Sequence, residues 1–318
     1  MTPTVSIYTP FRKGGPWFAG EQLATALQET GRWRADHYHS LPALAASLVW
    51  PAGNVTISVN PIQFHRPGQH LVLWIHGNLA QERQNPLSRL YARSIRIADQ
   101  IVVPSQYLKR VLQLEQAIVI PNAVPIPSRP ASIRTRPHEF RILTVTKFLF
   151  PEKSQGVFTL TKILNGLPME LRQQIRLTVL GDGPYRPKIE RAVRSLGITV
   201  VFAGFQRPER YLMEADIFAY YSMHDNLPLA VLEAMAAGLP VVSNPVGALP
   251  DVITSGKTGE LAETDNAYRA ALTAFIHEPE RRRDIGTAAR QMVEEAYSWP
   301  AVTDSWCSLL DSLRGDQQ

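Results

Sequence analysis

The sequence predicts an α/β protein built from two parallel sheets. Short runs rich in Val, Ile and Leu alternate with segments of helical periodicity, and this alternation stops at a proline-rich stretch over 121–137 and then restarts. A chain of 318 residues has room for about two domains of ~150 residues each. With 45% hydrophobic and 19% charged residues, it can fill two cores and does not belong to the disordered or fibrous classes.

Six strands are predicted in the first half of the chain, each a short apolar or β-branched run bounded by polar or turn residues. They cover residues 5–9, 33–38, 55–59, 71–75, 100–103 and 117–120. Helical patterns at 21–29 and 87–97 lie between them. Strands that alternate with helices pair in parallel, so we expect a first parallel sheet here.

Several prolines between 121 and 137 interrupt any regular pattern, because proline lacks a backbone N–H and fixes its own φ. We therefore place a linker at 129–138, between an N-terminal domain over 1–128 and a C-terminal domain over 139–298. The alternation that follows predicts a second parallel sheet. Its strands are expected at 140–145, 175–180, 199–203, 217–221 and 240–243.

Charge is unevenly distributed between the two halves. Residues 1–138 hold 14 Lys and Arg against 6 Asp and Glu, whereas residues 139–318 hold 19 against 22. A basic first half fits an anionic partner, which nucleic acid, an anionic lipid surface or a phosphorylated small molecule would satisfy. The single cysteine, Cys307, excludes an internal disulfide and a thiolate metal cage. No apolar run reaches the ~18 residues of a membrane span and residues 1–10 lack a secretion signal, so a cytoplasmic location is expected.

Two lysines follow the strand predicted at 140–145. Lys147 comes directly after its last residues, and Lys153 lies six residues further on, just before a predicted helix. Parallel sheets bind ligands outside the carboxyl ends of their strands. Two ammonium groups beside the positive end of a helix dipole can hold a diphosphate without a metal ion. The alternative is two solvated lysines on a surface loop.

A turn with two glycines, Gly181-Asp182-Gly183, follows the strand predicted at 175–180. Glycine allows the backbone to approach a flat or phosphorylated ligand closely. Arg186 occupies the place of the third glycine in the dinucleotide fingerprint, so that fingerprint is incomplete. The alternative is an ordinary turn that connects a strand to a helix.

The segment 225–238 reads as a helix that Asp225 or Asn226 caps and that Gly238 ends. Glu233 stands on a stripe of alanines beside a purely apolar face. Asp225 lies two turns earlier, so both carboxylates are expected along one wall, where the hydroxyl groups of a sugar would be natural partners. The alternative for Glu233 is a buried acid that a backbone amide satisfies.

Glycine and histidine mark two strand ends in the first half. Gly14 and Gly15 follow the strand at 5–9, and such a pair can bring backbone amides onto a phosphate. His76 follows the strand at 71–75, which places an imidazole at the end of the sheet where ligands bind. A structural histidine is the alternative.

Two further groups have the composition of a site. Arg89, Arg93 and Arg96 fall on one helix face, which suits an anionic acceptor or a membrane surface, and a solvated face is the alternative. Residues 36–39 read Asp-His-Tyr-His, but their alternation is that of a strand, so we assign no metal site.

Taken together, these residues resemble the retaining, nucleotide-sugar-dependent glycosyltransferases of family 4, which have the GT-B fold of two Rossmann-like parallel-sheet domains facing a cleft. The resemblance covers nearly the whole chain and is strongest over 140–262. It rests on the segments 147–156, 181–184, 202–204 and 233–242, on the carboxylates Asp225 and Glu233, and in the first half on Gly14, Gly15, His76, 103–105 and 120–122.

The resemblance implies roles for these residues. Both lysines would bind the donor diphosphate, Glu233 would hold the ribose hydroxyls and Asp225 the transferred sugar. The catalytic positions that it implies are His76, Lys147, Lys153, Asp225 and Glu233. The donor-binding positions that it implies are Gly14, Gly15, Gly181, Asp182, Gly183, Phe205, Asn226 and Leu227. It also implies a C-terminal helix over 299–316 that returns to the first domain.

The activity implied by this resemblance is hexosyl transfer from a nucleoside diphosphate sugar to a hydroxyl of a saccharide or lipid-linked acceptor, with retention of configuration. No metal and no other cofactor is expected, and no nucleic acid partner. Peripheral contact at the inner face of a membrane is compatible with the basic first half. Lys147 stands where the family usually has arginine, and Asp225 where it usually has glutamate. These two differences bear on which donor is used and on the rate of transfer, more than on whether the chain is active. Two other hypotheses stay open: a weakly active homologue that binds nucleotide or glycan, and a sugar-nucleotide epimerase.

Overall fold

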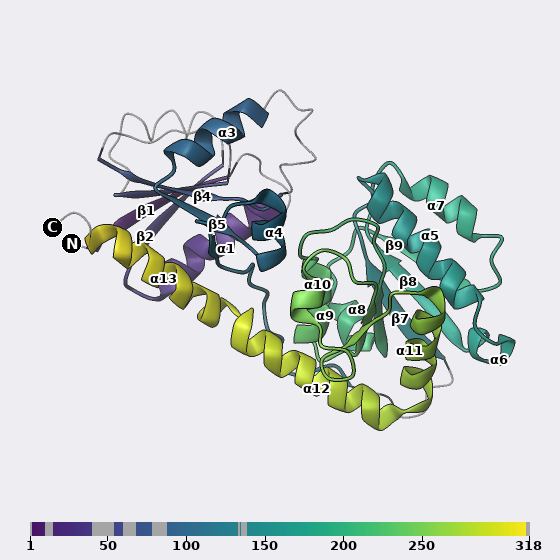
Figure 1. Cartoon of the computed structure of the whole chain (residues 1–318). Coiled ribbons are helices and arrows are strands. Elements are labelled where there is room, and N and C mark those ends of the chain that lie inside the picture. Colours follow the sequence, from purple (N-terminus) through teal and green to yellow (C-terminus); the bar gives the residue numbers. More distant parts are fainter. Residues whose placement is uncertain are drawn as a thin grey trace. The chain divides into compact units, whose positions relative to one another are not determined.

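The protein consists of two compact units, each with a parallel sheet flanked by helices (Figure 1). The first unit comprises 1–123 and 297–318, and the second comprises 124–296. The predicted class, α/β with two parallel sheets, is confirmed. The computed structural model describes residues 2–9, 15–39, 54–59, 68–77, 88–132, 134 and 139–315.

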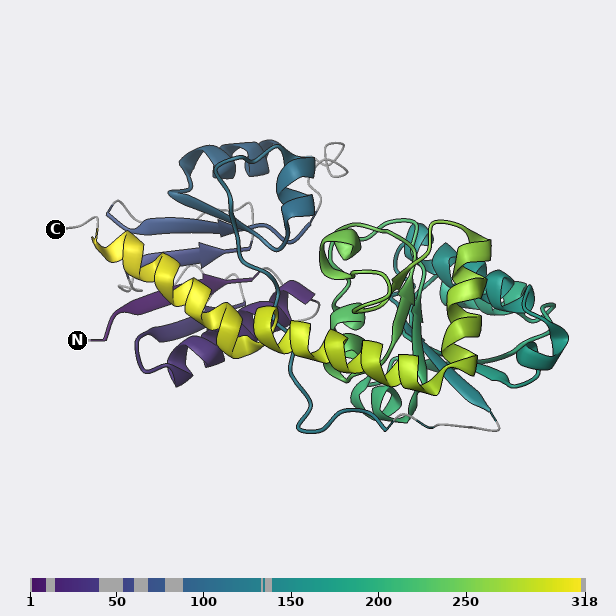
Figure 2. The same ribbon diagram turned by 60° about the horizontal axis from the view of Figure 1, so that its bottom comes forward.

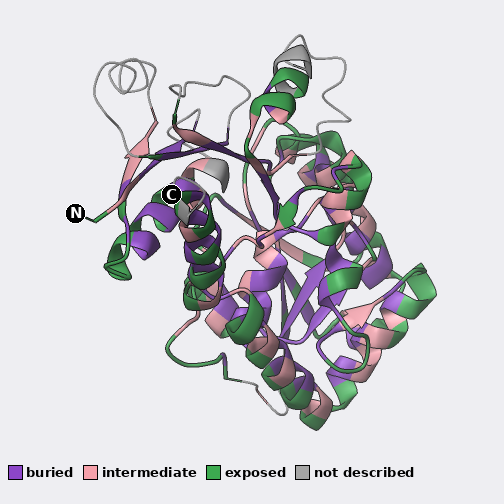
Figure 3. Ribbon diagram, turned by 60° about the vertical axis from the view of Figure 1, so that its left-hand side comes forward, coloured by how far each residue is buried: buried purple, intermediate pink, exposed green. Residues whose placement is uncertain are grey.

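The first unit contains a six-stranded parallel sheet in the order β2-β1-β3-β4-β5-β6. The strands lie close to their predicted positions, and the four inner strands of the sheet are buried on both faces, as in a sheet that helices cover (Figure 3). They are β1 (Thr4–Tyr8), β2 (Arg34–Tyr38), β3 (Val55–Ser58), β4 (His70–Trp74), β5 (Gln100–Val103) and β6 (Ile118–Val119).

The described helices of the first unit are α1 (Gly15–Glu29), α3 (Ser88–Ile97), α4 (Gln106–Leu112) and α13 (Trp299–Gly315). The last of these comes from the end of the chain and lies along α1 (Figure 2). Its Trp306 and Leu310 are fully buried in the core of the first unit, and Asp311 accepts a hydrogen bond from Trp33 Nε1 at 3.2 Å. The first unit is therefore built from two separate stretches of sequence.

The second unit contains another six-stranded parallel sheet, in the order β12-β11-β10-β7-β8-β9. Its strands are β7 (Phe140–Val145), β8 (Ile175–Leu180), β9 (Thr199–Gly204), β10 (Ile217–Tyr220), β11 (Val241–Ser243) and β12 (Glu260–Leu261). The chain adds β8 and β9 on one side of β7 and then returns to add β10 on the other side. The strand order thus reverses between β7 and β10, which is where open parallel sheets bind their ligands.

Helices cover this second sheet: α5 (Pro151–Asn165), α6 (Met169–Arg172), α7 (Arg186–Val193), α8 (Glu209–Glu214), α9 (Leu229–Ala236), α10 (Leu249–Val252), α11 (Asp265–His277) and α12 (Pro279–Ala296). The main core of the unit lies under α5 and α11, whose Leu160, Ile163 and Phe275 pack on the sheet and are fully buried. Burying each such side chain stabilises the fold by about 1.5–3 kcal/mol. Within the described ranges, no helix combines the length and the apolar content needed to cross a bilayer.

The proline-rich segment is held against the second unit. Ala131 N donates to Ala237 O at 2.7 Å, and the Arg290 guanidinium donates to Pro127 O at 2.7 Å and to Ala236 O at 2.9 Å. Within the described part of the predicted linker, 129–132 and 134, Ala131 is thus hydrogen-bonded to the C-cap residue of α9, and Pro127 just before the linker is hydrogen-bonded to α12; residues 133 and 135–138 lie outside the described residues.

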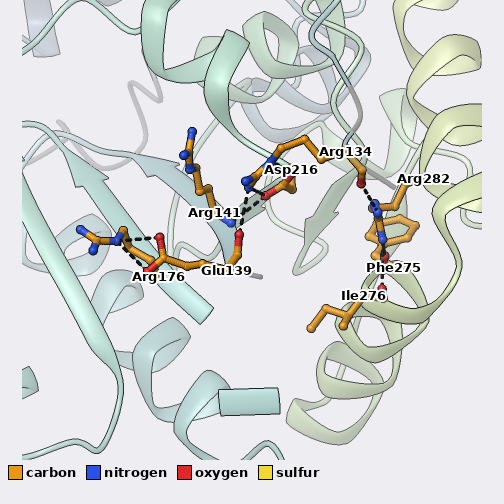
Figure 4. A network of polar contacts seen from close by, with 8 residues as sticks. All are labelled: Arg134, Glu139, Arg141, Arg176, Asp216, Phe275, Ile276 and Arg282. Atoms are coloured by element: carbon orange, nitrogen blue, oxygen red, sulfur yellow. Dashed lines mark hydrogen bonds and ion pairs between the residues drawn. The ribbon is translucent and has the colours of Figure 1, made fainter. Parts of the chain in front are cut away.

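A buried charge network fixes the end of this segment (Figure 4). The fully buried Asp216 accepts hydrogen bonds from the Arg134 guanidinium, at 2.9 Å from Nε, and from Arg141 N at 2.8 Å. The fully buried Arg282 donates to Arg134 O at 2.7 Å and to the carbonyl oxygens of Phe275 and Ile276. Because both buried charges have partners, their loss of hydration is offset.

Asp216→Ala should lower the free energy of unfolding by about 1–3 kcal/mol, because it removes the acceptor of Arg141 N and of the Arg134 guanidinium, whose side chain is 35% exposed and recovers part of its hydration. Urea unfolding, followed by tryptophan fluorescence and circular dichroism, measures the change. The control is Glu139→Ala, which removes a surface ion pair with Arg176 whose partners are 43% and 45% exposed and should cost less than about 1 kcal/mol. Equal losses in the two variants would contradict the assignment of the network as a structural core.

Candidate functional site

Charged side chains from two strand ends meet where the strand order of the second unit reverses. Lys147 follows β7, Asp225 lies in the loop after β10, and Lys153 lies at the beginning of α5. Lys153 Nζ donates to Asp225 Oδ2 at 2.7 Å. Lys147 interacts electrostatically with both of these groups. The structure therefore brings three of the five predicted catalytic residues together.

Lys153 is held beside Asp225 by the position of α5. This helix begins at Pro151, so Lys153 lies inside its first turn. The sequence pattern predicts a helix that begins only after this lysine. The helix can approach the loop after β10 because residue 156 is glycine: a Cβ there would stand 2.0 Å from Tyr221 O. Phe150 at the N-cap supplies no side-chain hydrogen bond, which leaves the first-turn N–H groups without a side-chain cap and open to an anion.

The Asp225 carboxylate is nearly buried and is held by three donors. Its Oδ1 accepts from Asn226 N at 2.8 Å, and its Oδ2 accepts from Tyr220 OH at 2.6 Å as well as from Lys153. Only 10% of the side chain is exposed. A buried carboxylate is stable when hydrogen bonds and an opposite charge compensate it, and both are present here.

The prediction that Asp225 or Asn226 caps a helix is wrong. The helix α9 begins at Leu229, with Pro228 at its N-cap. Proline disfavours the α conformation in the residue that precedes it, so the helix cannot extend back through Leu227. The carboxylate of Asp225 turns instead to Lys153 and Tyr220. It follows that Asp225 and Glu233 are not carried by one continuous helix.

The loop after β10 is fixed by close backbone packing. Gly247 has a φ of +60°, and a Cβ at this residue would stand 2.3 Å from the carbonyl oxygens of both Asp225 and Asn226. Ala248 N donates to Asn226 O at 2.7 Å. The Leu227 side chain is buried, so the backbone amide is what this residue can offer a ligand. These contacts hold the predicted donor-binding positions 226 and 227 in a defined place.

The turn of Gly181, Asp182 and Gly183 packs on the segment around Lys147. A Cβ on Gly181, whose φ is +124°, would stand 1.7 Å from Thr146 O, and one on Gly183 would stand 2.4 Å from Phe148 O. Asp182 Oδ1 accepts from Gly183 N at 2.8 Å, so this side chain stabilises its own turn. The glycines thus allow two strand-end loops to lie together.

The charge balance of the cluster favours an anionic ligand. Among the described residues of the cluster, two ammonium groups stand against one carboxylate, which leaves a net charge of about +1. Partial desolvation lowers the pKa of Lys147 from its ordinary value, the ammonium of Lys153 lowers it further, and the Asp225 carboxylate opposes both. A doubly charged phosphate group would relieve the repulsion between the lysines.

Glu233 stands apart from the lysine cluster, on α9. Burial raises its pKa to about 7, and the carboxylate of Glu209 on α8 adds to this shift. Among the described residues, neither Lys147 nor Lys153 forms an ion pair with Glu233. Phe205, the last donor-binding position predicted in this unit, follows β9 and is 80% exposed.

The site residues predicted in the first unit lie after β4, at the start of α1 or outside the described residues. His76 follows β4 and its ring lies 4.2 Å from that of Trp74. Desolvation lowers the pKa of His76 to about 3, so the imidazole is neutral near pH 7. Gly15 is the first residue of α1, whereas Gly14 lies outside the described residues. On α3, Arg93 and Arg96 are exposed.

Sequence reasoning missed Tyr220, which ends β10 and donates to the carboxylate of Asp225. The only signal was a tyrosine as the last residue of a strand that otherwise reads Ile-Phe-Ala. Among the described residues, no group of three or more His, Cys, Asp or Glu side chains could hold a metal ion. The group at 36–39 belongs to β2 and its end, where His37 Nε2 lies 2.8 Å from Thr9 Oγ1.

Glu233→Gln should stabilise the protein at pH 8 and leave its stability unchanged near pH 4. Because the folded-state pKa of Glu233 lies near 7, above the ordinary 4.5, stability falls as pH rises from 4.5 to 7. That shift corresponds to about 3 kcal/mol at most, which a neutral side chain avoids. Thermal unfolding across this pH range measures the difference. The exposed Glu263→Gln serves as the control, and an equal pH dependence in both variants would refute the shift.

Comparison with known proteins places the second unit in a family. The family described as glycosyl transferases group 1 matches residues 132–292, about half of the chain. A curated relative, a sulfoquinovosyl transferase of Arabidopsis thaliana, is 35% identical over 143 residues, which are 42% of this chain and 28% of that protein. The chain spans less than half of the length of the curated relatives that it matches.

Two solved structures are similar over nearly the whole chain. The structure of sucrose-phosphate synthase from Thermosynechococcus elongatus superposes with a TM-score of 0.82 at 18% identity, and the similarity covers 99% of this chain and 100% of the chain of that structure. The structure of HepE of Anabaena in complex with UDP and glucose has a TM-score of 0.78 at 16% identity, and the similarity covers 98% of this chain and 100% of the HepE chain. At these identities the likeness shows the fold, and the predicted GT-B fold is confirmed. From the match over 132–292, the chain belongs to the group 1 glycosyl transferases, as the resemblance to family 4 predicted.

Proposed function

We propose that this chain transfers a hexosyl group from a nucleoside diphosphate sugar to a hydroxyl group of a saccharide or lipid-linked acceptor. The reaction proceeds with retention of configuration and without a metal ion. One observation carries the proposal: Lys153, in the first turn of α5, pairs with Asp225, and Lys147 interacts electrostatically with both groups, where the strand order reverses. This is a site of positive charge at the ligand-binding end of a Rossmann-like sheet.

The cluster suits the departure of a nucleoside diphosphate. During transfer, the bond between the anomeric carbon and the diphosphate oxygen breaks, and the acceptor oxygen bonds to that carbon and loses its proton to the departing diphosphate oxygen. Negative charge develops on the leaving oxygen, and fixed ammonium groups and helix N–H groups stabilise it. The residues of this chain thus supply what a divalent cation would otherwise supply. Retention is proposed from the family resemblance.

Glu233 is the proposed partner of the donor ribose. A carboxylate accepts hydrogen bonds from two neighbouring hydroxyl groups, and a binding ribose would supply donors to a group that burial leaves poorly solvated. The exposed Phe205 and the backbone amides of Asn226 and Leu227 are proposed to complete the donor site. HepE was solved with UDP and glucose, so UDP-glucose is the first donor to test.

The acceptor is proposed to bind residues of the first unit. His76 is the proposed contact on this side, beside the transferred sugar and the acceptor, whereas Gly14 and Gly15 are proposed to bind the donor. The exposed Arg93 and Arg96 on α3 support an anionic or lipid-linked acceptor, and with it a cytoplasmic protein in peripheral contact with the inner membrane face. The neutral state of His76 supports a role as a hydrogen-bond partner of a sugar.

A donor panel tests the proposal. UDP, GDP and ADP sugars are incubated with the purified chain, with and without oligosaccharide or polyprenyl phosphate sugar acceptors, and the released nucleotide and sugar products are measured. Release that depends on an acceptor supports the proposal. Isomerised sugar nucleotide without an acceptor would indicate an epimerase, and donor binding without release would indicate a binding protein.

Lys153→Ala should reduce turnover by about 10²- to 10³-fold, because it removes a group that stabilises the leaving diphosphate. Steady-state nucleotide release measures the effect. Lys162→Ala is a matched control, because Lys162 lies in the last turn of the same helix and is exposed. Loss of the same size in both variants, or an unchanged rate in Lys153→Ala, would overturn the proposed role.

Turnover should be insensitive to the removal of divalent cations. The lysine cluster already supplies positive charge at the diphosphate, so an excess of EDTA is expected to change the initial rate by less than about twofold. The same nucleotide-release measurement, repeated after addition of Mg²⁺ or Mn²⁺ to the chelated protein, provides the control. A rate that vanishes with EDTA and returns with either cation would contradict metal-independent transfer.

A further inference from the structure

We propose that Tyr220 is a positioning residue, whose hydroxyl group fixes the Asp225 carboxylate so that it holds the Lys153 ammonium in place before a donor binds. The functional part of this inference rests on the proposed function, because it assigns Lys153 to the donor diphosphate. The positional part concerns only these three side chains and is tested separately.

The geometry joins the three groups through one oxygen atom. Tyr220 OH donates to Asp225 Oδ2 at 2.6 Å, and Lys153 Nζ donates to the same atom at 2.7 Å. The other carboxylate oxygen accepts from Asn226 N at 2.8 Å. With both oxygens engaged, the carboxylate cannot rotate without breaking a hydrogen bond, so the position of its Oδ2 is defined.

The lysine needs such a support because its side chain is flexible. An ammonium on four methylene groups loses considerable rotamer freedom when it is fixed, and about a quarter of the Lys153 side chain is exposed (26%). Its hydrogen bond to Asp225 restricts it to one place. Catalysis of group transfer requires charged groups that are already oriented when charge develops, so a fixed ammonium is worth more than a mobile one.

Tyr220 is itself rigidly placed. It is the last residue of β10, and only 3% of it is exposed. Its carbonyl oxygen accepts from the hydroxyl of the buried Tyr268 at 3.0 Å, which ties this strand end to α11. Burial, and next to it the Asp225 carboxylate, raises the pKa of Tyr220 well above its ordinary value. The phenol is therefore a neutral donor throughout the working pH range.

The sequence supports this assignment of roles. Resemblance implies that position 225 usually carries glutamate, whose side chain is one methylene longer. In this chain the hydroxyl of Tyr220 reaches the shorter aspartate from the strand end, at 2.6 Å from Oδ2. The inference predicts that the pair acts as a unit, so that removing Tyr220's hydroxyl matters only while the carboxylate at 225 is present.

Chemical labelling of lysines tests the positional part without any substrate. Tyr220→Phe keeps the buried ring and deletes only the hydroxyl. An amine-acylating reagent is applied briefly to the full chain, and the labelling rate of Lys153 is read by mass spectrometry against Lys162 as internal reference. We expect a rise of about threefold or more for Lys153 in Tyr220→Phe and a larger rise in Asp225→Asn, because a freed ammonium is more accessible.

The double variant decides whether Tyr220 acts through Asp225. In the Asp225→Asn background, Tyr220→Phe should add less than about 1.5-fold to the labelling of Lys153. Thr258→Val is the matched control: it also deletes a buried hydroxyl of the second unit, one that accepts from Thr254 N at 2.9 Å, but should leave Lys153 labelling unchanged. Unchanged labelling in Tyr220→Phe, or equal changes in Tyr220→Phe and Thr258→Val, would overturn the inference.

Kinetics with a donor then test the functional part. Tyr220→Phe should lower kcat by about tenfold with a smaller change in the donor KM, and should have almost no further effect in the Lys153→Ala background. Additive losses in the double variant would refute action through Lys153. A wild-type chain that uses no donor would defeat the proposed function, while the labelling results would still decide the positional inference.

Discussion

The arrangement of the second unit depends on a carboxylate that cannot be buried alone. Asp225 lies almost out of solvent, and removing an ion from water costs several kcal/mol unless partners compensate it. Its partners come from β10, from its own loop and from the first turn of α5. Asp225 and Lys153 therefore depend on each other: Lys153 compensates the charge of the buried Asp225 carboxylate, and the Asp225 carboxylate fixes the position of the Lys153 ammonium.

Small residues make this meeting possible. Gly156 and Gly247 allow backbone to lie where any side chain would collide with a carbonyl oxygen, so the loop after β10 is pressed between α5 and the start of α10. The same close packing recurs where Gly181 and Gly183 contact the segment around Lys147. The charged groups are thus held by main-chain contacts on several sides, which is the kind of support that a preorganised anion site requires.

The sequence predicted the class and nearly all the strands, because alternating apolar runs and helical patterns are local signals. It could not predict β12, which has only two residues and no apolar run, nor the start of α9, where Pro228 overrides an apparent cap. Lys147, Lys153 and Asp225 were found because they follow strands. The link through Tyr220 could not be found, because the contact between a strand-end phenol and a carboxylate depends on the fold of the loop between them.

The return of α13 to the first unit has a consequence for biosynthesis. Trp306 and Leu310 belong to the core of that unit, although the whole second unit, residues 124–296, lies between this helix and the rest of the first unit in the sequence. Most of the second unit can fold before α13 leaves the ribosome, whereas the first unit, synthesised earlier, must wait with an unfinished core until α13 has emerged. The order of folding is then the reverse of the order of synthesis, and the early-made half is the natural client of chaperones.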